Sequence, residues 1–282
     1  MDSAEREFEF EAADFRRVRK LIHRHAGIAL ADSKQQLVYS RLSRRLRALG
    51  LRSFREYLDA LEAGRLEDWQ EFVNALTTNL TSFFRESHHF PILARHLQRP
   101  GAGHPQRIWC SAASTGEEPY SIAIAAIEAL GPRPALHILA TDIDTHCLDS
   151  AQEGIFPMER VAKLPQERLK RFFLRGTGAR SGQVRIRPEV QALVEFKQLN
   201  LLQERYPFDC RFDAIFCRNV MIYFDQTTQL RLVERFAPLL VPDGLLFCGH
   251  SENLSRVRHI FRLRGQTVYE LTAGSGAARA AA

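Results

Sequence analysis

The sequence lacks the long apolar runs, leader signals and paired cysteines that mark membrane-spanning or secreted chains. No apolar run approaches the ~18–20 residues that a helix needs to cross a bilayer. The N-terminal stretch MDSAEREFEFEAADF is acidic and contains no apolar segment, unlike a secretory signal. The five cysteines are odd in number and form no C-x-x-C pair, which disfavours a disulfide framework or a zinc site. We therefore predict a cytoplasmic protein whose cysteines are mostly small buried side chains.

The sequence also lacks histidines at the spacing of metal ligands. His23 and His25 are two residues apart on a predicted helix, so they face different sides of it. His88 and His89 are adjacent. We expect these four histidines to be structural or to lie on the surface, and we predict no metal site.

Positive charge is in excess and is concentrated near the N-terminus. The chain has a net charge of +6, but residues 14–52 contain eleven Lys or Arg against only Asp14 and Asp32. This block therefore carries +9, and the rest of the chain carries −3. A basic block on a nearly neutral body suggests an acidic partner, either a protein surface or a nucleic acid.

Within the basic block, residues 32–49 have the pattern of an amphipathic helix that ends at Gly50. The apolar positions recur at helical spacing and form a stripe: Val38, Leu42, Leu46 and Leu49. Four basic residues fall on one arc beside that stripe: Lys34, Arg41, Arg44 and Arg45. We interpret the arc as a docking face, with an ordinary solvated face as the alternative.

The pattern of elements changes along the chain. Residues 14–97 read as helices, including one that a capping box opens at Ser53 and Glu56. After a Pro- and Gly-rich segment at 98–105, apolar strands alternate with helices, which indicates an α/β fold with a largely parallel sheet. The predicted strands are 107–112, 135–141, 194–201, 212–219 and 244–250, followed by one or two more near the end. Residues 154–193 interrupt the alternation and predict a small inserted subdomain, and the tail 273–282 has nothing to bury and is expected to be disordered.

A loop of small residues follows the first predicted strand, in the segment IWCSAASTGEEPYS. In open α/β sheets, ligands bind beyond the carboxyl ends of the strands. The loop contains one glycine, Gly116, and matches neither G-x-G-x-x-G nor a P-loop, which disfavours a pyrophosphate ligand. Glu117 and Glu118 open the next helix, where they would repel phosphate and attract a cation.

An acidic residue ends the second predicted strand. Asp142 lies 26 residues after Gly116, and a carboxylate in this place typically accepts hydrogen bonds from ribose hydroxyls. A cationic ribose-bearing cofactor without phosphates satisfies both features, and S-adenosylmethionine is such a molecule. Asp142 could instead cap the following helix, although Asp144 suits that position better.

Four segments of the chain resemble a known family, the chemotaxis receptor methyltransferases (CheR family). They are NALTTNLTSFFRE (74–86), SAASTGEEPYSIA (111–123), ATDIDT (140–145) and FCRNVMIYFD (216–225). The resemblance covers nearly the whole chain. It implies a Rossmann-like S-adenosylmethionine methyltransferase domain at 86–282 with a small inserted antiparallel β subdomain at 154–193. An all-α N-terminal domain at 1–85 precedes it.

The resemblance also implies roles for individual residues. Arg218 and Tyr223 should lie beside the transferred methyl group as the catalytic pair. The implied cofactor-binding residues are Asn79, Thr81, Arg85, Gly116, Glu117, Asp142, Asn200, Leu201, Cys217 and Arg218. The implied receptor-docking residues are Lys34, Arg41, Arg44 and Arg45.

The implied activity is transfer of a methyl group from S-adenosylmethionine to glutamate carboxylates on the cytoplasmic helices of chemoreceptors, with S-adenosylhomocysteine as the product. A glutamate carboxylate is ionised at neutral pH, so the transfer needs no general base. We expect a monomer that inserts into no membrane and binds no nucleic acid, with a receptor C-terminal tether peptide as a further partner at the inserted subdomain. The alternatives are a nucleic-acid methyltransferase, which the absence of an N/D-P-P-Y/F motif disfavours, and a cofactor-binding scaffold without activity. For Arg218, a purely structural salt bridge also stays open.

Overall fold

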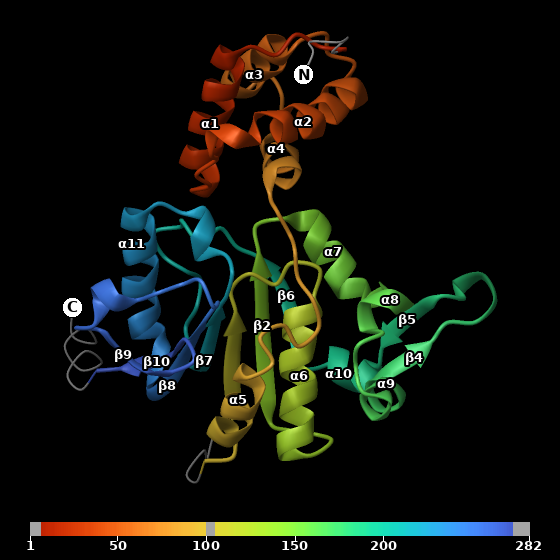
Figure 1. The fold of residues 1–282 in the computed structure, drawn as a ribbon, viewed down its shortest axis with the longest axis vertical. Helices are drawn as coiled ribbons and strands as arrows, with labels where there is room; N and C mark the ends of the chain where they lie inside the picture. Colours follow the sequence, from red (N-terminus) through yellow and green to blue (C-terminus); the bar gives the residue numbers. More distant parts are fainter. Residues whose placement is uncertain (1–6, 100–104, 273–282) are drawn as a thin grey trace. The chain divides into compact units, whose positions relative to one another are not determined.

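The computed structural model describes residues 7–99 and 105–272. These residues form two compact units, one of helices and one built on a sheet (Figure 1). The helical unit contains the described residues up to Thr78 together with Tyr223–Asp225, and the α/β unit contains the others. Two predicted segments lie outside the described residues. They are the tail 273–282, which was expected to be disordered, and most of the Pro- and Gly-rich segment 98–105.

The helical unit is built from four α-helices and one short 3-10 turn. They are α1 (Ala12–Ala26), η1 (Asp32–Lys34), α2 (Gln35–Leu49), α3 (Phe54–Glu62) and α4 (Trp69–Leu76). The apolar stripe predicted for 32–49 is confirmed at Val38, Leu42 and Leu46, whose side chains are fully buried. Gly50 ends α2 in the left-handed conformation, as the sequence predicts.

The cap of α3 also follows from its sequence. The Ser53 hydroxyl accepts a hydrogen bond from the Glu56 N–H at 3.1 Å. The Glu56 carboxylate reaches back to the N–H of Arg52, one residue before the cap, at 2.9 Å. The first bond satisfies an N–H group that the first turn of a helix leaves without an intrahelical partner, and the second fixes the residue before the cap.

The α/β unit contains a seven-stranded sheet in the order β6-β2-β1-β7-β8-β10-β9. The five strands from β6 to β8 are parallel, and β10 and β9 are antiparallel additions at one edge. The bounds are β1 (Gln106–Cys110), β2 (Leu136–Asp142), β6 (Val194–Gln198), β7 (Phe212–Cys217), β8 (Leu240–Cys248), β9 (Phe261–Gly265) and β10 (Val268–Leu271). The predicted α/β fold with a largely parallel sheet is thereby confirmed.

Helices and short turns connect these strands. The helices are α5 (His89–Leu97), α6 (Glu117–Leu130), α7 (Thr145–Glu153) and α11 (Gln226–Phe236). Three 3-10 turns accompany them: η3 (Met221–Tyr223), η4 (Ala237–Leu239) and η5 (Ser255–Val257).

The alternation of side chains along β1 places helices on both faces of the sheet. Ile108 and Cys110 pack into the core that includes α5 and α6. Trp109 points to the opposite face, where its ring lies 5.3 Å from that of Phe236 in α11. Trp109 is fully buried, and its indole N–H donates to the Thr141 hydroxyl at 2.9 Å.

The interruption of the α/β pattern forms a second, three-stranded antiparallel sheet in the order β3-β5-β4. In Figure 1 it lies beside α6 and α10, away from the antiparallel edge of the large sheet. Its elements are β3 (Ile155–Pro157), α8 (Met158–Val161), α9 (Gln166–Phe172), β4 (Phe173–Arg175), η2 (Gly178–Arg180), β5 (Gln183–Ile186) and α10 (Pro188–Gln191). The small inserted antiparallel β subdomain is therefore present.

The segment from Asn79 to Arg85 belongs to the α/β unit, whereas the sequence analysis placed it with the helical domain. The Phe84 N–H donates to the Ser121 hydroxyl of α6 at 2.9 Å. The Phe83 ring packs edge-on against Phe156 and Phe173 of the inserted subdomain, at 5.0 and 5.4 Å. These contacts attach the segment to the sheet unit, which a pattern of small and aromatic residues alone does not reveal.

None of the helices in the described ranges 7–99 and 105–272 is both long enough and apolar enough to span a membrane.

The packing of Trp109 gives a first prediction. Trp109→Ala should lower the free energy of unfolding of the α/β unit by about 3–5 kcal/mol, because it leaves a cavity among buried rings and removes a hydrogen bond to Thr141. The chain's other tryptophan, Trp69, lies half-buried in the helical unit and stacks on His25. Trp69→Ala is the matched control, and urea denaturation followed by circular dichroism measures both. An equal and small loss in the two variants would contradict the packing described for Trp109.

Candidate active site

The carboxyl ends of the central strands come together at one edge of the large sheet. The chain passes from β1 to β2 on one side and returns to β7 on the other, so the end of β1 is the point where the strand order reverses. Hydrogen bonds join the loops there. The Ser111 N–H donates to the Phe216 carbonyl at 2.9 Å, and the Leu199 N–H donates to the Asp142 carbonyl at 2.9 Å. Residues after β1, β2, β6 and β7 are thus neighbours.

Gly116 is required by the backbone and by helix packing. Its φ is +99°, which disfavours a residue with a side chain. A Cβ here would also lie 3.0 Å from the Cβ of Ala151 in α7. The glycine expected in the ligand loop therefore allows α6 to begin close against α7.

Glu117 is a fully buried carboxylate at the start of α6. Its Oε2 accepts a hydrogen bond from the Thr115 hydroxyl at 2.6 Å. Its Oε1 has no hydrogen-bond partner among the described residues, and the Arg160 guanidinium lies 3.4 Å away. A buried oxygen that lacks a donor is costly, so this position favours a ligand with N–H groups or positive charge.

Asp142 is buried at the end of β2, and its two oxygens are held by different N–H groups. Oδ2 accepts from Ser114 at 2.7 Å and Oδ1 accepts from Asp144 at 3.0 Å. Burial raises the pKa of Asp142 to about 6, although the backbone hydrogen bonds oppose this shift. Asp144, not Asp142, caps α7 by accepting from the Cys147 N–H at 3.1 Å.

Asn200 and Leu201 follow β6, next to the end of β2. The Asn200 side-chain oxygen accepts from the Leu202 N–H at 2.9 Å, which shapes this turn. Leu201 is buried, and its carbonyl accepts from the Tyr206 hydroxyl at 2.8 Å. Both residues therefore follow β6, which β2 separates from β1 and from the loop that contains Glu117.

The segment that contains Asn79, Thr81 and Arg85 contacts the loop after β1. The Asn79 amide donates to Asp144 at 2.7 Å, and the Ser114 hydroxyl donates to the Asn79 carbonyl at 3.0 Å. The Thr81 carbonyl accepts from Arg160 at 3.3 Å, and the Arg85 side chain donates to the Leu80 carbonyl at 2.9 Å. The structure thus brings these three residues close to the ends of β1 and β2.

Arg218 follows Cys217 at the end of β7, and the side chains of both residues are buried. The Arg218 guanidinium donates to Glu118 at 2.8 Å and to the Arg85 carbonyl at 2.5 Å. It also lies 3.4 Å from Glu86. Burial raises the pKa of Glu118, and the charge of Arg218 opposes this shift. Arg218 therefore forms a buried salt bridge, and its charge is shared with internal partners.

Backbone strain marks the same region. Four residues other than glycine have positive φ angles and lie in loops at this edge: Phe84, Glu86, Ser114 and Asn219, with φ between 48° and 57°. Left-handed conformations cost energy in residues with side chains and often occur at functional sites. Two other residues with positive φ, Gln266 and Thr267, lie in the turn between β9 and β10, so four of the six such positions in the described residues lie near the buried carboxylates.

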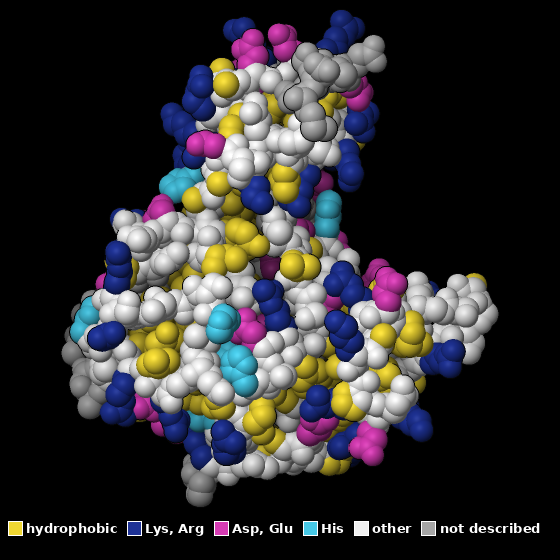
Figure 2. All heavy atoms as spheres, viewed as in Figure 1, with side chains coloured by type: hydrophobic (Ala, Val, Ile, Leu, Met, Phe, Trp, Pro, Cys, Tyr) yellow, Lys and Arg dark blue, Asp and Glu magenta, His cyan; other side chains and the backbone are white. Residues whose placement is uncertain are grey.

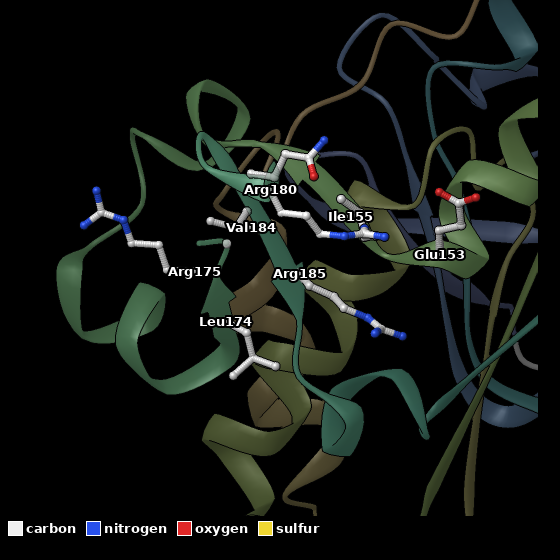
Figure 3. Close-up of a pocket in the computed structure, with 9 residues that line it drawn as sticks. Glu153, Ile155, Leu174, Arg175, Arg180, Val184 and Arg185 are labelled. Carbon is white, nitrogen blue, oxygen red and sulfur yellow. The ribbon is translucent and has the colours of Figure 1, made fainter. Parts of the chain in front are cut away.

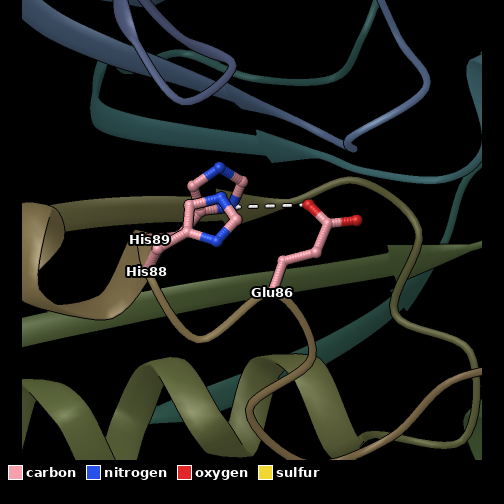
Figure 4. A group of neighbouring side chains, drawn as sticks. All are labelled: Glu86, His88 and His89. Atoms are coloured by element: carbon pink, nitrogen blue, oxygen red, sulfur yellow. Dashed lines mark ion pairs between the residues drawn. The ribbon is translucent and has the colours of Figure 1, made fainter.

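Glu86 also lies close to His88 and His89, the two adjacent histidines that were expected to be structural or to lie on the surface (Figure 4). His89 is buried, its Nε2 lies 2.8 Å from the Gln266 carbonyl, and its Nδ1 lies 3.9 Å from Glu86. Burial lowers the pKa of His89 to about 4, so the ring is neutral near pH 7. Such a group could hold a metal ion, but Arg218 already provides Glu86 with a positive neighbour.

Tyr223 belongs to the helical unit by its contacts. Its carbonyl accepts from the Ala29 N–H at 2.8 Å, and its hydroxyl donates to the Thr78 carbonyl at 3.4 Å. Asp225 nearby lies 2.9 Å from His23 of α1. The stretch 223–225 is thereby attached to the helices.

The four basic residues predicted to form a docking face differ in their surroundings. Lys34 and Arg44 are exposed. Arg45 forms an ion pair with Asp68, which is buried and also accepts from the Tyr57 hydroxyl at 2.8 Å. Arg41 donates to the carbonyls of Ala75 and Thr77 at the end of α4. Two members of the arc therefore hold helices together, and two are open to solvent. Figure 2 shows basic side chains spread over the visible face of the helical unit rather than gathered in one patch.

Glu86, Ser114 and Glu252 at the sheet edge were given no site role from the sequence, and Glu118 was expected only to repel phosphate and attract a cation. Glu118, Glu86 and Ser114 support the residues that were named, and Glu252 holds the turn after β7. A signal existed for Glu118, because it is an acid on a helix whose other buried residues are mostly apolar. Glu252 lies in the GHSEN segment directly after a buried strand, where polar residues often contribute to sites.

The chemistry of this edge fits S-adenosylmethionine. Glu117 offers a buried oxygen that accepts no hydrogen bond from the described residues, which suits the cofactor's amino group. Asp142 is a buried acceptor in the place where ribose hydroxyls are bound. Two carboxylates in the first turn of α6 disfavour a phosphate group at that helix N-terminus.

Comparisons with known proteins give the family. The chain matches the family model "CheR methyltransferase, all-alpha domain" over residues 13–77 and the model "CheR methyltransferase, SAM binding domain" over residues 79–270. It is 56% identical over 262 residues to the chemotaxis protein methyltransferase of Salmonella typhimurium, covering 92% of this chain and 90% of that protein. It is 56% identical over 265 residues to chemotaxis protein methyltransferase 2 of Pseudomonas aeruginosa, covering 93% and 94%. The Escherichia coli chemotaxis protein methyltransferase is 54% identical over 262 residues, covering 92% and 91%. A buried acidic edge suited to S-adenosylmethionine, an all-α N-terminal unit and these matches lead to one conclusion: the chain belongs to the CheR methyltransferase family.

Proposed function

We propose that this methyltransferase transfers a methyl group from S-adenosylmethionine to glutamate side chains of chemoreceptors, forming glutamate methyl esters. The observation that carries the proposal is the set of buried carboxylates at the ends of β1 and β2, which suits a cationic cofactor with a ribose and no phosphate. The names of the relatives support chemoreceptors as the acceptors.

The cofactor supplies a methyl group on a positively charged sulfur, so the chain itself needs to provide binding, orientation and exclusion of water. Glu117 would hold the amino group, and Asp142 would accept hydrogen bonds from the ribose. The acceptor glutamate has an ordinary pKa of about 4.3 and is an anion at neutral pH, so no residue needs to remove a proton from it. Alignment of the reacting groups can contribute about 7–11 kcal/mol.

Arg218 and Tyr223 are proposed to have different roles in methyl transfer. Because Arg218 is buried against Glu118 and the Arg85 carbonyl, we assign it to positioning the loops around the methyl group rather than to direct contact with substrate. Tyr223 follows five residues later, in the family motif FCRNVMIYFD, and is proposed to help fix the geometry of transfer. The remaining implied cofactor contacts, Asn79, Thr81, Arg85, Asn200, Leu201 and Cys217, remain proposals that rest on the family motifs.

The inserted subdomain is proposed to bind a receptor tether peptide. A pocket of about 520 Å³ lies on its sheet and contains three arginines, Arg175, Arg180 and Arg185 (Figure 3). The pocket is also lined by the apolar side chains of Ile155, Leu174 and Val184 and by the acidic Glu153. β4 is an edge strand of the three-stranded sheet, and a short peptide can add to such an edge by main-chain hydrogen bonds.

A methyl-transfer assay tests the proposed function. The chain is incubated with methyl-labelled S-adenosylmethionine and a receptor cytoplasmic fragment, with and without the receptor's C-terminal segment, and with RNA and DNA in parallel. We expect label on the receptor fragment that alkali releases as methanol, and a lower rate when the C-terminal segment is missing. Label that resists alkali, or that enters nucleic acid instead, would refute glutamate esterification. Equal rates with both fragments would refute the tether alone.

The raised pKa of Asp142 predicts a pH-dependent affinity for S-adenosylhomocysteine. As the pH falls through about 6, the carboxyl gains a proton and loses acceptor capacity for the ribose hydroxyls. If only the ionised form binds, the dissociation constant should rise about tenfold between pH 7.5 and pH 5. Calorimetric titration at several pH values measures this change.

Two variants serve as controls for the pH dependence. Asp142→Asn should bind more weakly at pH 7.5 and lose most of the pH dependence. Glu128 is an exposed residue of α6 that pairs with Arg168. Glu128→Gln removes this pair and should keep the parent's affinity for S-adenosylhomocysteine at every pH. A parent dissociation constant that is the same at pH 5 and pH 7.5 would show that Asp142 does not bind the cofactor through its charge.

The surroundings of the basic residues predict different effects for neighbouring arginines. Arg44→Ala should slow methylation of the receptor fragment at low salt and weaken its salt dependence, because Arg44 is exposed and can steer an acidic helix. Its stability should stay unchanged. Arg45→Ala should instead lower the stability of the helical unit by about 1–3 kcal/mol, because it leaves the buried Asp68 without its ion pair. Salt titrations of the rate and thermal melts measure the two effects, and an unchanged salt slope for Arg44→Ala would argue against docking there.

A further inference from the structure

We propose that Glu252 is a positioning residue for methyl transfer, and that it acts by holding the turn that connects β7 to Tyr223. This inference rests on the proposed function, because it assigns a part in the same reaction to a residue outside the four family motifs that carry the resemblance. The observations that support it are hydrogen bonds, burial and the space around Gly249.

Glu252 is buried, with only 5% of its surface exposed. Its carboxylate accepts hydrogen bonds from three backbone N–H groups. Oε1 accepts from Met221 at 2.8 Å, and Oε2 accepts from Asn219 at 2.9 Å and from Gly249 at 2.6 Å. A single side chain therefore joins the turn after β7 to the turn after β8.

The turn that Glu252 holds contains a strained residue. Asn219 has a φ of 57°, and its side-chain amide donates to Glu86 at 3.2 Å. The hydrogen bond from the Asn219 N–H to Glu252 helps to stabilise this strained conformation, so its loss should favour a relaxed backbone. The turn directly follows the buried Arg218, so a shift in it would displace the Arg218 side chain.

The space around Gly249 is a second and independent observation. A Cβ at position 249 would lie 2.8 Å from the Asn219 backbone N and 2.9 Å from the Glu252 carboxylate. It would also lie 2.5 Å from the side-chain amide of Asn219. The two turns approach so closely that only glycine fits, which is what a carboxylate bridging two backbones requires.

Both oxygens of the Glu252 carboxylate act as acceptors, so even replacement by glutamine, which has nearly the same shape, should disturb the turn. Each carboxylate oxygen faces at least one N–H, so both sides of the group must be acceptors. In Glu252→Gln, one side becomes an NH₂ that opposes a backbone N–H in either orientation of the amide. The turn must then move or lose a hydrogen bond.

The test separates rate from cofactor binding. Glu252→Gln should reduce kcat for the receptor fragment about 100-fold, the size of effect that a displacement of about 1 Å can have. The dissociation constant for S-adenosylhomocysteine should change less than about threefold, because Glu117 lies at the start of α6 and Asp142 at the end of β2, away from the turns after β7 and β8. Gly249→Ala should reproduce the loss, Glu252→Asp should be intermediate, and the exposed Glu128→Gln should match the parent.

Hydrogen–deuterium exchange supplies a readout that does not depend on activity. In Glu252→Gln the amides of Asn219, Met221 and Gly249 should exchange faster, while amides of β1 and β2 keep their protection. A folded variant with the parent's kcat would overturn the proposal, as would parallel losses of kcat and of S-adenosylhomocysteine affinity. If the parent itself methylates no receptor fragment, the proposed function fails, and the exchange data still decide whether Glu252 holds the turn.

Discussion

The burial of carboxylates at the carboxyl edge of the sheet is the constraint on which the rest of the α/β unit depends. Glu117, Glu118, Asp142 and Glu252 are all buried there. A buried anion is costly unless hydrogen bonds or opposite charges compensate it. The loops of this edge therefore have to place donors around each carboxylate, and this requirement explains their irregular backbone.

Each carboxylate is compensated in a different way. Glu118 has the Arg218 guanidinium, and Asp142 and Glu252 have backbone N–H groups. Glu117 has the Thr115 hydroxyl on one oxygen and the Arg160 guanidinium 3.4 Å from the other. Among the described residues, Glu117 Oε1 is the one oxygen of these four carboxylates that accepts no hydrogen bond, which fits the proposed role of Glu117 in binding a ligand.

Much of the fold could be predicted from the sequence, because periodicity and capping reflect local physics. The stripe at Val38, Leu42 and Leu46, the cap at Ser53 and the alternating strands and helices are all visible in the chain itself. The small residues of SAASTGE and the acid that ends β2 likewise led to the prediction of a ligand site at this edge. What the sequence could not reveal were partners distant along the chain, such as Asp68 for Arg45, Glu118 for Arg218 and the turn held by Glu252. Basic residues at helical spacing cannot be assigned to solvent or to ion pairs from the sequence alone. The structure shows that Arg44 is exposed and that Arg45 pairs with Asp68.

The pairing of Arg218 also affects how its mutation can be interpreted. Removing one partner of a buried ion pair leaves the other charge without compensation, and this penalty can exceed what the pair itself contributes. Loss of activity in Arg218→Ala would therefore reflect an unpaired Glu118 and displaced loops as readily as a missing contact with substrate. Replacing Arg218, Glu118 and Glu86 together by neutral residues of similar volume removes that penalty, because Glu86 also lies 3.4 Å from the guanidinium. Because the guanidinium also donates to the Arg85 carbonyl, activity that returns in the triple variant would place the function of Arg218 in loop geometry, whereas activity that stays absent would place it in its charge.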